Sequence, residues 1–302
     1  MISKYENDDI KHVQFERYFV ALIALTSALN LAFISLGGPL ALNIIKYRFS
    51  EATEWQVMGQ DLANLLILAP ICLIGGILLL RDNKGAYTWL ALPGLYMMYT
   101  GMSYAIGNEW SHPAYQNIGA NVESYSFFLI WMSVSGLILL VYSIPHIDTQ
   151  DAPDLNPNVR KVIVGLMTVL LTLFTFMWLG EMFEVANTGT LAGSTAYEDG
   201  PTLFWVIRTF DLSLSFPLGF ISIYLLATRP KKAYPLLLAF FGFFVTMGTA
   251  VVLMAVVMVL NNDPSVQVPL LVILPTLMIL SYSCFFLLVR EKIQNSISRL
   301  RN

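Results

Sequence analysis

The chain is dominated by long segments that contain no charged residue. Such segments, of 17 to 30 residues, include 19–45, 62–80, 124–145, 162–180, 212–228, 233–262 and 265–289. A helix of about 20 apolar residues crosses the ~30 Å hydrocarbon core of a bilayer. Charged residues make up only 12% of the 302 residues, against about 25% in soluble domains. The sequence therefore predicts a membrane protein.

These segments, together with 85–106, predict an all-α membrane protein with about eight transmembrane helices. We expect the helices at about 18–45, 60–80, 85–106, 123–145, 161–184, 203–228, 232–261 and 266–290. An even number of spans places both termini on the same side of the membrane. Residues 1–17 mix both charge signs and lack a small-residue cleavage site, so we expect no cleaved signal peptide.

The basic residues indicate which side that is. The termini, the linker and two turns would share one side and hold 14 of the 17 Lys and Arg residues, in 1–17, 81–84, 146–161, 229–232 and 290–301. Basic residues in short loops stay on the cytoplasmic side. We therefore expect a multi-pass protein of the cell membrane with both termini cytoplasmic, and a basic tail at 291–302 that continues the last helix along the inner headgroups.

The loops on the opposite side are acidic and aromatic, as in Glu109-Trp110 and Tyr197-Glu198-Asp199. One interpretation is an interfacial aromatic belt with solvated acids. The other is a vestibule that attracts cations. The sequence leaves both interpretations open.

The chain also contains an internal repeat. A shift of 147 residues aligns 64–101 with 211–248 without a gap and gives ten identities in 38 positions, including Pro70 with Pro217 and Lys84 with Lys231. Because each half would have four helices, the halves would share one orientation, as in parallel-repeat transporters. The predicted divisions are an N-terminal segment 1–17, a first four-helix repeat 18–145, a linker 146–160, a second four-helix repeat 161–290 and a tail 291–302.

Ionisable side chains inside spans are costly and are candidates for function. Six candidate residues that would bind an ion or ligand lie near the outer ends of the predicted spans: Asp61, Asn64, Glu181, Glu184, Arg208 and Asp211. Arg208 and Asp211 are three residues apart and share a helical face. In the first half, Asp61 and Asn64 have the same spacing at the matching place.

These residues allow two interpretations. In the structural one, Arg208 pairs with Asp211 or Glu181 and locks two helices together without chemistry. In the functional one, they form an outer-leaflet pocket for a cation, a proton or a small polar ligand, lined by Trp178 and 189–194. The Gly37-Gly38-Pro39 run can also kink or break the first helix and free its carbonyls.

Motifs for catalysis, metals and cofactors are not found in the sequence. The three histidines, His12, His112 and His146, lie far apart, and there is no Cys-x-x-Cys, Gly-x-Ser-x-Gly, phosphate-loop or dinucleotide motif. We therefore predict no catalytic residues, no metal and no cofactor. An intramembrane enzyme ranks lowest among the candidate functions.

Part of the second half resembles a known family. The motif Trp178-Leu179-Gly180-Glu181, the pair Asp211-Leu212, Pro217 and the basic turn 229–234 are similar to an uncharacterised prokaryotic multi-pass membrane protein family. Ser213 stands where that family has a glycine. The resemblance implies the same fold and a shared role for Glu181 and Asp211, and it implies no activity.

Two functions remain open. The first is binding or transport of an ion or small solute through the outer-leaflet pocket. The second is a non-transporting membrane sensor or a subunit of a membrane complex. The expected partners are the lipid bilayer, a small ion or solute, and a membrane-protein partner or a second copy of the chain. No nucleic-acid partner is expected.

Overall fold

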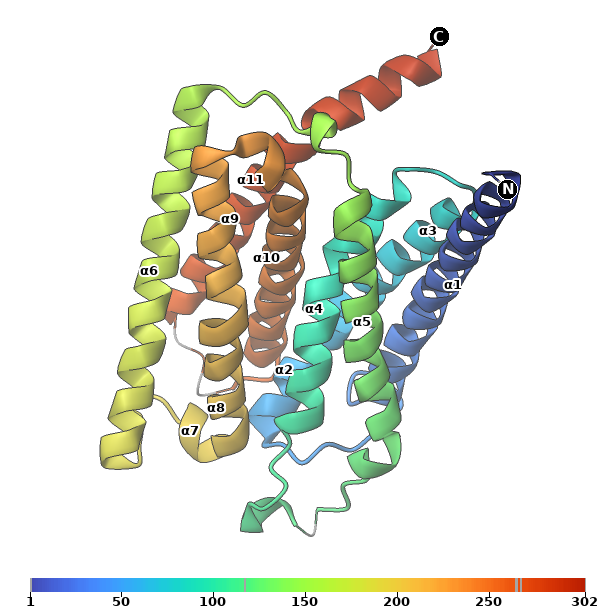
Figure 1. The fold of residues 1–302 in the computed structure, drawn as a ribbon. Helices are drawn as coiled ribbons and strands as arrows, with labels where there is room; N and C mark the ends of the chain where they lie inside the picture. The colour runs from blue at the N-terminus through green and yellow to red at the C-terminus, as the bar shows by residue number, and fades with distance from the viewer. Residues whose placement is uncertain (1, 117, 264–265, 267, 302) are drawn as a thin grey trace.

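A computed structural model describes residues 2–116, 118–263, 266 and 268–301, and only the backbone of 2–13, 268–270 and 290–301. Every regular element in this part of the chain is helical (Figure 1). The α-helices are α1 (Ile2–Gly37), α2 (Glu51–Ala63), α3 (Ala69–Leu80), α4 (Ala86–Ile106), α5 (Ser126–His146), α6 (Pro157–Thr188), α7 (Ala196–Asp199), α8 (Pro201–Phe210), α9 (Phe216–Thr228), α10 (Pro230–Leu260) and α11 (Val268–Arg301).

Seven helical stretches among the described residues are long and apolar enough to cross a membrane. They are Gln14–Gly37, Glu51–Leu80, Val122–His146, Pro157–Thr188, Pro201–Thr228, Pro230–Leu260 and Leu271–Val289. Both ends of the described chain lie at the same end of the bundle (Figure 1). The fold is therefore compatible with an integral membrane protein.

The eighth stretch in the predicted set is α4. It has 21 residues, which is long enough to span a bilayer, but it is less apolar than the seven stretches above. Tyrosine, threonine and serine side chains on α4 are buried, because the helix packs against α3, α5 and α10. A helix enclosed by other helices can carry polar groups that a lipid-facing helix cannot.

The first helix ends earlier than the sequence predicts. It was expected to reach residue 45 and ends at Gly37, because Pro39 disfavours a helical conformation at Gly38. The N–H groups of Ile44 and Ile45 then donate to the Gly37 carbonyl at 2.7 and 2.8 Å. The chain turns back on itself there, and the loop 38–50 buries Tyr47 in the bundle.

The second helix begins nine residues earlier than the predicted start at 60. Ser50 caps its first turn, accepting a hydrogen bond from the Thr53 N–H at 3.2 Å. Glu51 and Glu54 occupy that turn, where negative charge is favourable because of the helix dipole. The early start places Asp61 in the third turn of a long helix.

Two of the long helices are interrupted by a wide π-helical turn. The first interruption, η1 (Asn64–Leu68), joins α2 to α3, and the second, η5 (Asp211–Ser215), joins α8 to α9. A proline two residues after each segment, Pro70 or Pro217, cannot donate a helical hydrogen bond, and its ring displaces the carbonyl four residues earlier. That carbonyl lies inside the π-helical turn, which accommodates it. Single π-helical turns often mark functional sites.

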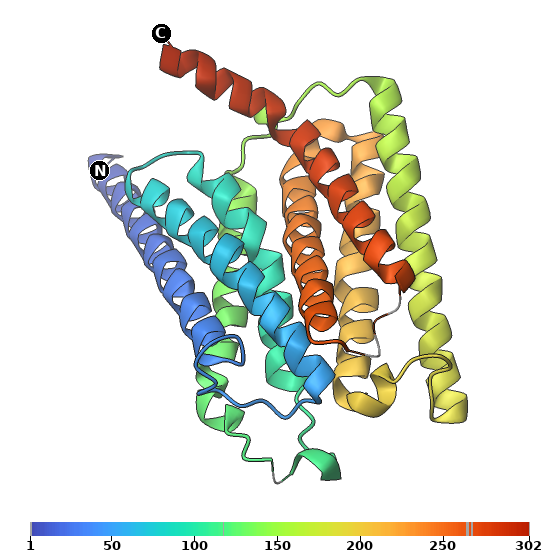
Figure 2. The same cartoon turned by 180° about the vertical axis from the view of Figure 1, so that it is seen from behind.

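The buried apolar residues form two main groups, one in each half of the chain. The larger draws mainly on α1 to α5, and the second mainly on α6 and α9 to α11. Helix α10 joins them, because it packs against both α2 and α4 (Figures 1 and 2). At the α2 contact, Gly59 lies so close to the Met254 backbone that a Cβ atom would have no room.

Helix α11 continues to Arg301 and leaves the bundle at its C-terminal end (Figure 2). The predicted continuation of the last helix into the tail agrees with this backbone. The side chains of 290–302, on which headgroup contact would depend, lie outside the described residues.

Candidate functional site

Asp61 is completely enclosed by protein. Its exposed fraction is 0%, as is that of Asn64. The amide of Asn64 donates to Asp61 Oδ1 over a long 3.5 Å, and the Tyr96 hydroxyl donates to Asn64 Oδ1 at 3.1 Å. One turn along, Gln60 donates to the Thr100 hydroxyl at 3.0 Å. Asn64 is thus held by a side chain of α4, and Asp61 is bonded to Asn64.

The second oxygen of Asp61, Oδ2, accepts no hydrogen bond from the described part of the chain. The same is true of three neighbouring hydroxyl groups, those of Ser35, Tyr47 and Tyr104. The Ser35 hydroxyl lies close enough to the Asp61 carboxylate to act on it as a hydrogen-bond donor, without the geometry of a regular hydrogen bond. Both tyrosines interact with the carboxylate electrostatically. The tyrosine rings contact each other edge to face at 5.6 Å between centroids. The Asp61 carboxylate thus has a serine hydroxyl beside it and two tyrosines near enough to act on its charge.

Gly38 makes this arrangement possible. A Cβ atom at this position would lie 3.0 Å from Asp61 Oδ2 and 3.7 Å from the Tyr47 ring. Tyr47 belongs to the loop 38–50, and its burial, reinforced by the charge of Asp61, raises the pKa of its hydroxyl well above the usual value. The Tyr47 phenol is therefore neutral at physiological pH.

Asp61 is not in any ion pair of the described residues. The pairs there are Arg17 with Asp82, Arg48 with Glu123, and Arg208 with Glu181. A buried carboxylate without a positive partner is strongly disfavoured. Asp61 therefore requires a proton or a cation from outside these groups.

The second half is arranged differently. Arg208 Nε and Nη2 both donate to Glu181 Oε2, at 2.9 and 2.5 Å. The guanidinium also lies over the rings of Phe204 and Trp178, at 3.5 and 4.6 Å from their centroids. Among the two partners considered for Arg208 from the sequence, Glu181 is the one it binds. The positive charge is thereby neutralised and covered by aromatic rings.

Asp211 has its own donor. The Trp178 indole N–H donates to Asp211 Oδ2 at 2.7 Å, and Tyr99 and Ser215 also lie beside the carboxylate. Trp178 therefore contacts both Arg208 and Asp211, and joins α6 to the interrupted helix. Glu181, Arg208 and Asp211 therefore lie close together around Trp178.

Glu184 has a separate contact. Its Oε1 accepts from the Ala192 N–H at 2.7 Å, so it holds the loop after α6. That loop begins at Gly189, whose positive φ of 73° ends the helix. Glu184 thus positions the segment 189–194, which the sequence suggested as part of the pocket lining.

Helix α4 lies between the two groups. Tyr96 and Thr100 face Asn64 and Gln60, while Tyr99 faces Asp211. These residues were not among the sequence candidates. Their signal was the unusual number of tyrosine, threonine and serine residues within 96–104, which a span exposed to lipid would not tolerate.

Glu109 in the loop after α4 is buried, with an exposed fraction of 2%, and so is not one of the solvated acids that one interpretation expected. Its carboxylate accepts from the N–H groups of Thr202 and Leu203 at 2.8 and 3.2 Å, and from the Thr202 hydroxyl at 2.8 Å. These contacts cap the N-terminus of α8 and tie the two halves together.

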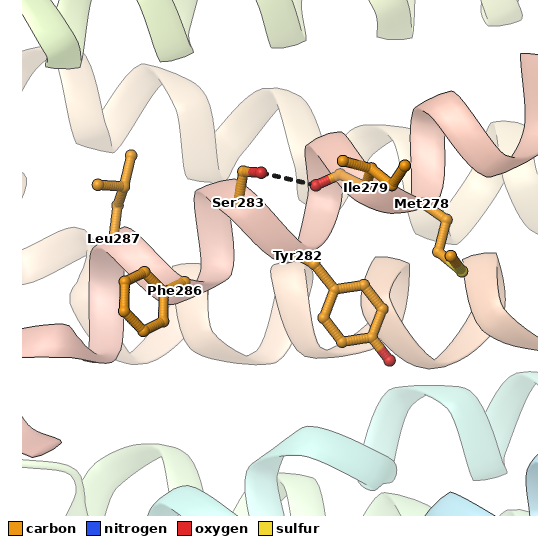
Figure 3. Close-up of a pocket in the computed structure, with 6 residues that line it drawn as sticks. All are labelled: Met278, Ile279, Tyr282, Ser283, Phe286 and Leu287. Atoms are coloured by element: carbon orange, nitrogen blue, oxygen red, sulfur yellow. Dashed lines mark hydrogen bonds between the residues drawn. The ribbon is translucent and has the colours of Figure 1, made fainter.

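An apolar groove runs along α11, on the outer side of the bundle. Figure 3 shows its lining, which consists of Met278, Ile279, Tyr282, Ser283, Phe286 and Leu287. The Ser283 hydroxyl donates to the Ile279 carbonyl at 2.8 Å, as the dashed line marks. The groove therefore presents almost no polar group to a ligand, and none of the candidate residues lines it.

No group of three or more His, Cys, Asp and Glu side chains suited to a metal ion occurs in the part of the chain that the structure describes. No protein-family model, no curated protein and no solved structure matches the chain. The resemblance based on Trp178 to Glu181 and Asp211-Leu212 is thus supported by its motifs alone.

Proposed function

We propose that the chain is an integral membrane protein that binds or transports an ion or small solute at polar groups on its two interrupted helices. The observation that carries this proposal is the buried Asp61 carboxylate, which has an unpaired oxygen and no cationic partner among the described residues. An ionisable group kept inside a membrane protein at this cost is expected to serve a function.

The proposal includes eight spans, with α4 as the eighth, arranged as two parallel repeats at 18–145 and 161–290. Its support is the position of the two π-helical turns, which begin at Asn64 and Asp211 and are therefore 147 residues apart, the same offset as the sequence repeat. The two separate groups of buried apolar residues also favour it. Duplicated halves commonly form a site between broken helices at bilayer depth.

The proposed protein lies in the cell membrane with both termini cytoplasmic. The excess of Lys and Arg on the side of the termini supports this orientation. The carboxylates then lie toward the outer ends of their helices. The aromatic side chains of α4 lie between the two groups, with Tyr96 bonded to Asn64 and Tyr99 beside Asp211.

The test is thermal unfolding of the purified full chain in detergent. The panel contains different ions, buffers of different pH and small metabolites. A ligand that binds the native state raises the unfolding temperature. We expect at least one panel member to stabilise the wild type and not the Asp61→Asn variant. If nothing in the panel changes the stability of the wild type, the proposal is wrong.

The alternative is a membrane sensor or subunit that transports nothing. Two observations favour it. The charges of Arg208 and Glu181 already neutralise each other. Most of the apolar surface of α6 is not covered by the rest of the protein. A surface of this kind suits a second copy of the chain or another membrane protein. Purification from native membranes with a stoichiometric partner, combined with silence in the ligand panel, would favour this alternative.

A further inference from the structure

We infer that Asp61 and the oxygen atoms around it bind a single monovalent alkali cation, with its hydration shell largely removed. This inference rests on the proposed function and names the class of ligand for the same site. It is carried by the cluster of the Asp61 carboxylate with the hydroxyl groups of Ser35, Tyr47 and Tyr104.

The donor chemistry selects a hard cation. All four unpaired atoms are oxygens, which alkali and alkaline-earth cations prefer, whereas transition metals prefer nitrogen and sulfur. The hydroxyl groups are neutral, and Asp61 supplies the single negative charge. A monovalent cation makes the cluster neutral, whereas a divalent cation would leave a net charge buried in the bundle.

The backbone adds a second, independent reason. Helix α1 ends at Gly37, and the Cβ position of the next residue, Gly38, lies 3.0 Å from Asp61 Oδ2. The C-terminal end of a helix carries a partial negative charge. Loop N–H groups bonded to the Leu36 and Gly37 carbonyls offset part of this charge. The remainder opposes a bare carboxylate and favours a cation beside Asp61.

The two neighbouring acids of the second half do not share these properties. Glu181 is paired with Arg208, and Asp211 accepts the indole N–H of Trp178. Arg208 takes the position that Asp61 has in the first half, at the 147-residue offset. A cation bound at Asp61 would thus neutralise the acid of the first half, as the Arg208 side chain neutralises Glu181 in the second.

The experiment is a sodium titration of the full chain in detergent. Thermal unfolding is followed as NaCl replaces choline chloride at constant ionic strength, at a pH well above the ordinary range of carboxyl groups. We expect a saturable rise in unfolding temperature for the wild type. Asp61→Asn should abolish the rise, whereas Asp154→Asn, which removes an exposed carboxylate in the linker, should retain it.

A second variant tests the geometry without removing the carboxylate. Gly38→Ala places a methyl group against Asp61 Oδ2 and should raise the half-maximal NaCl concentration about tenfold, equivalent to about 1.4 kcal/mol. Gly165→Ala is the matched control, because a Cβ atom there meets nothing within 4 Å. Should Asp61→Asn fail to fold, Tyr104→Phe takes its place, since it removes one oxygen and preserves the ring.

The outcomes separate the inference from the proposed function. Stabilisation by acid alone, without any effect of NaCl or KCl, overturns the inference and leaves the proposed function standing with a proton as the ion. If a different panel member stabilises the protein in a way that depends on Asp61, and alkali cations have no effect, the inference is also overturned. The proposed function then stands with that solute as the ligand. An equal NaCl effect in the wild type and Asp61→Asn also overturns the inference.

Discussion

The two interrupted helices have the same backbone feature and opposite electrostatics. In the first, the π-helical turn begins at Asn64, and Asp61 lies three residues earlier. In the second, the turn begins at Asp211, and Arg208 lies three residues earlier. The second half neutralises its charges with a protein partner and an indole N–H. The first half leaves a buried carboxylate oxygen unpaired. Similar backbones can therefore serve a rigid connection in one half and a binding site in the other.

The largest loss of stability, and the strongest test of this comparison, is expected from a change at Arg208. Arg208→Met leaves Glu181 in the bundle without its partner and should lower the free energy of unfolding by about 3 kcal/mol. The check is equilibrium unfolding in detergent. Adding Glu181→Leu to the same chain should restore most of the loss. A double variant as unstable as the single one would contradict a purely structural pair.

The next effect concerns the contact between the halves. Gly59→Ala forces a methyl group against the α10 backbone at Met254 and should cost about 2 kcal/mol by overpacking. Val206 has the matching place in the second half and lies on a part of the helix that is less enclosed, so Val206→Ala is the control. Unfolding temperatures of the two variants give the answer. Equal losses would mean that the halves are packed alike.

A comparable but smaller effect is expected at Trp178. Trp178→Phe keeps the aromatic ring over Arg208 and removes the indole N–H that Asp211 accepts. The loss should be about 1.5 kcal/mol, as for a hydrogen bond to a charged group. Denaturant midpoints measured with Asp211→Asn in the background complete a double-mutant cycle. Full additivity of the two changes would show that the bond contributes nothing.

The smallest effect is expected in the first half. Tyr96→Phe removes one neutral hydrogen bond to Asn64 and should cost about 1 kcal/mol. Because Asn64 orients toward Asp61, the same variant should also weaken the response to NaCl. Unfolding with and without sodium separates the two effects. A loss of stability with an unchanged sodium response would place Asn64 outside the cation site.

Much of this architecture follows from the sequence. Uncharged runs located the long apolar helices. In the sequence, the interval of 147 residues pairs Asn64 with Asp211, the residues at which the two π-helical turns begin. The end of α1 at Gly37 was less predictable, because a Gly-Gly-Pro run can bend a helix or break it; here the helix breaks and the following loop buries Tyr47. The start of α2 depended on a serine cap at Ser50 that hydropathy does not detect.

Only some residues of the candidate site could be predicted from the sequence. Charged residues inside apolar runs stand out, so Asp61, Glu181, Arg208 and Asp211 could be found. Ser35 and Tyr47 could not, because a single neutral hydroxyl group in a helix or a loop carries no signal of its own, and only tertiary packing brings it to a carboxylate. The partner of Arg208 depended in the same way on how α6 meets α8.

The most direct test of the central claim is an infrared difference spectrum of the full chain, recorded as NaCl replaces choline chloride. Cation binding at a carboxylate shifts its stretching bands. We expect a sodium-induced carboxylate signal in the wild type and in Asp211→Asn, and its loss in Asp61→Asn. A signal that persists in Asp61→Asn and disappears in Asp211→Asn would contradict the account, because the available charge would then lie in the second half.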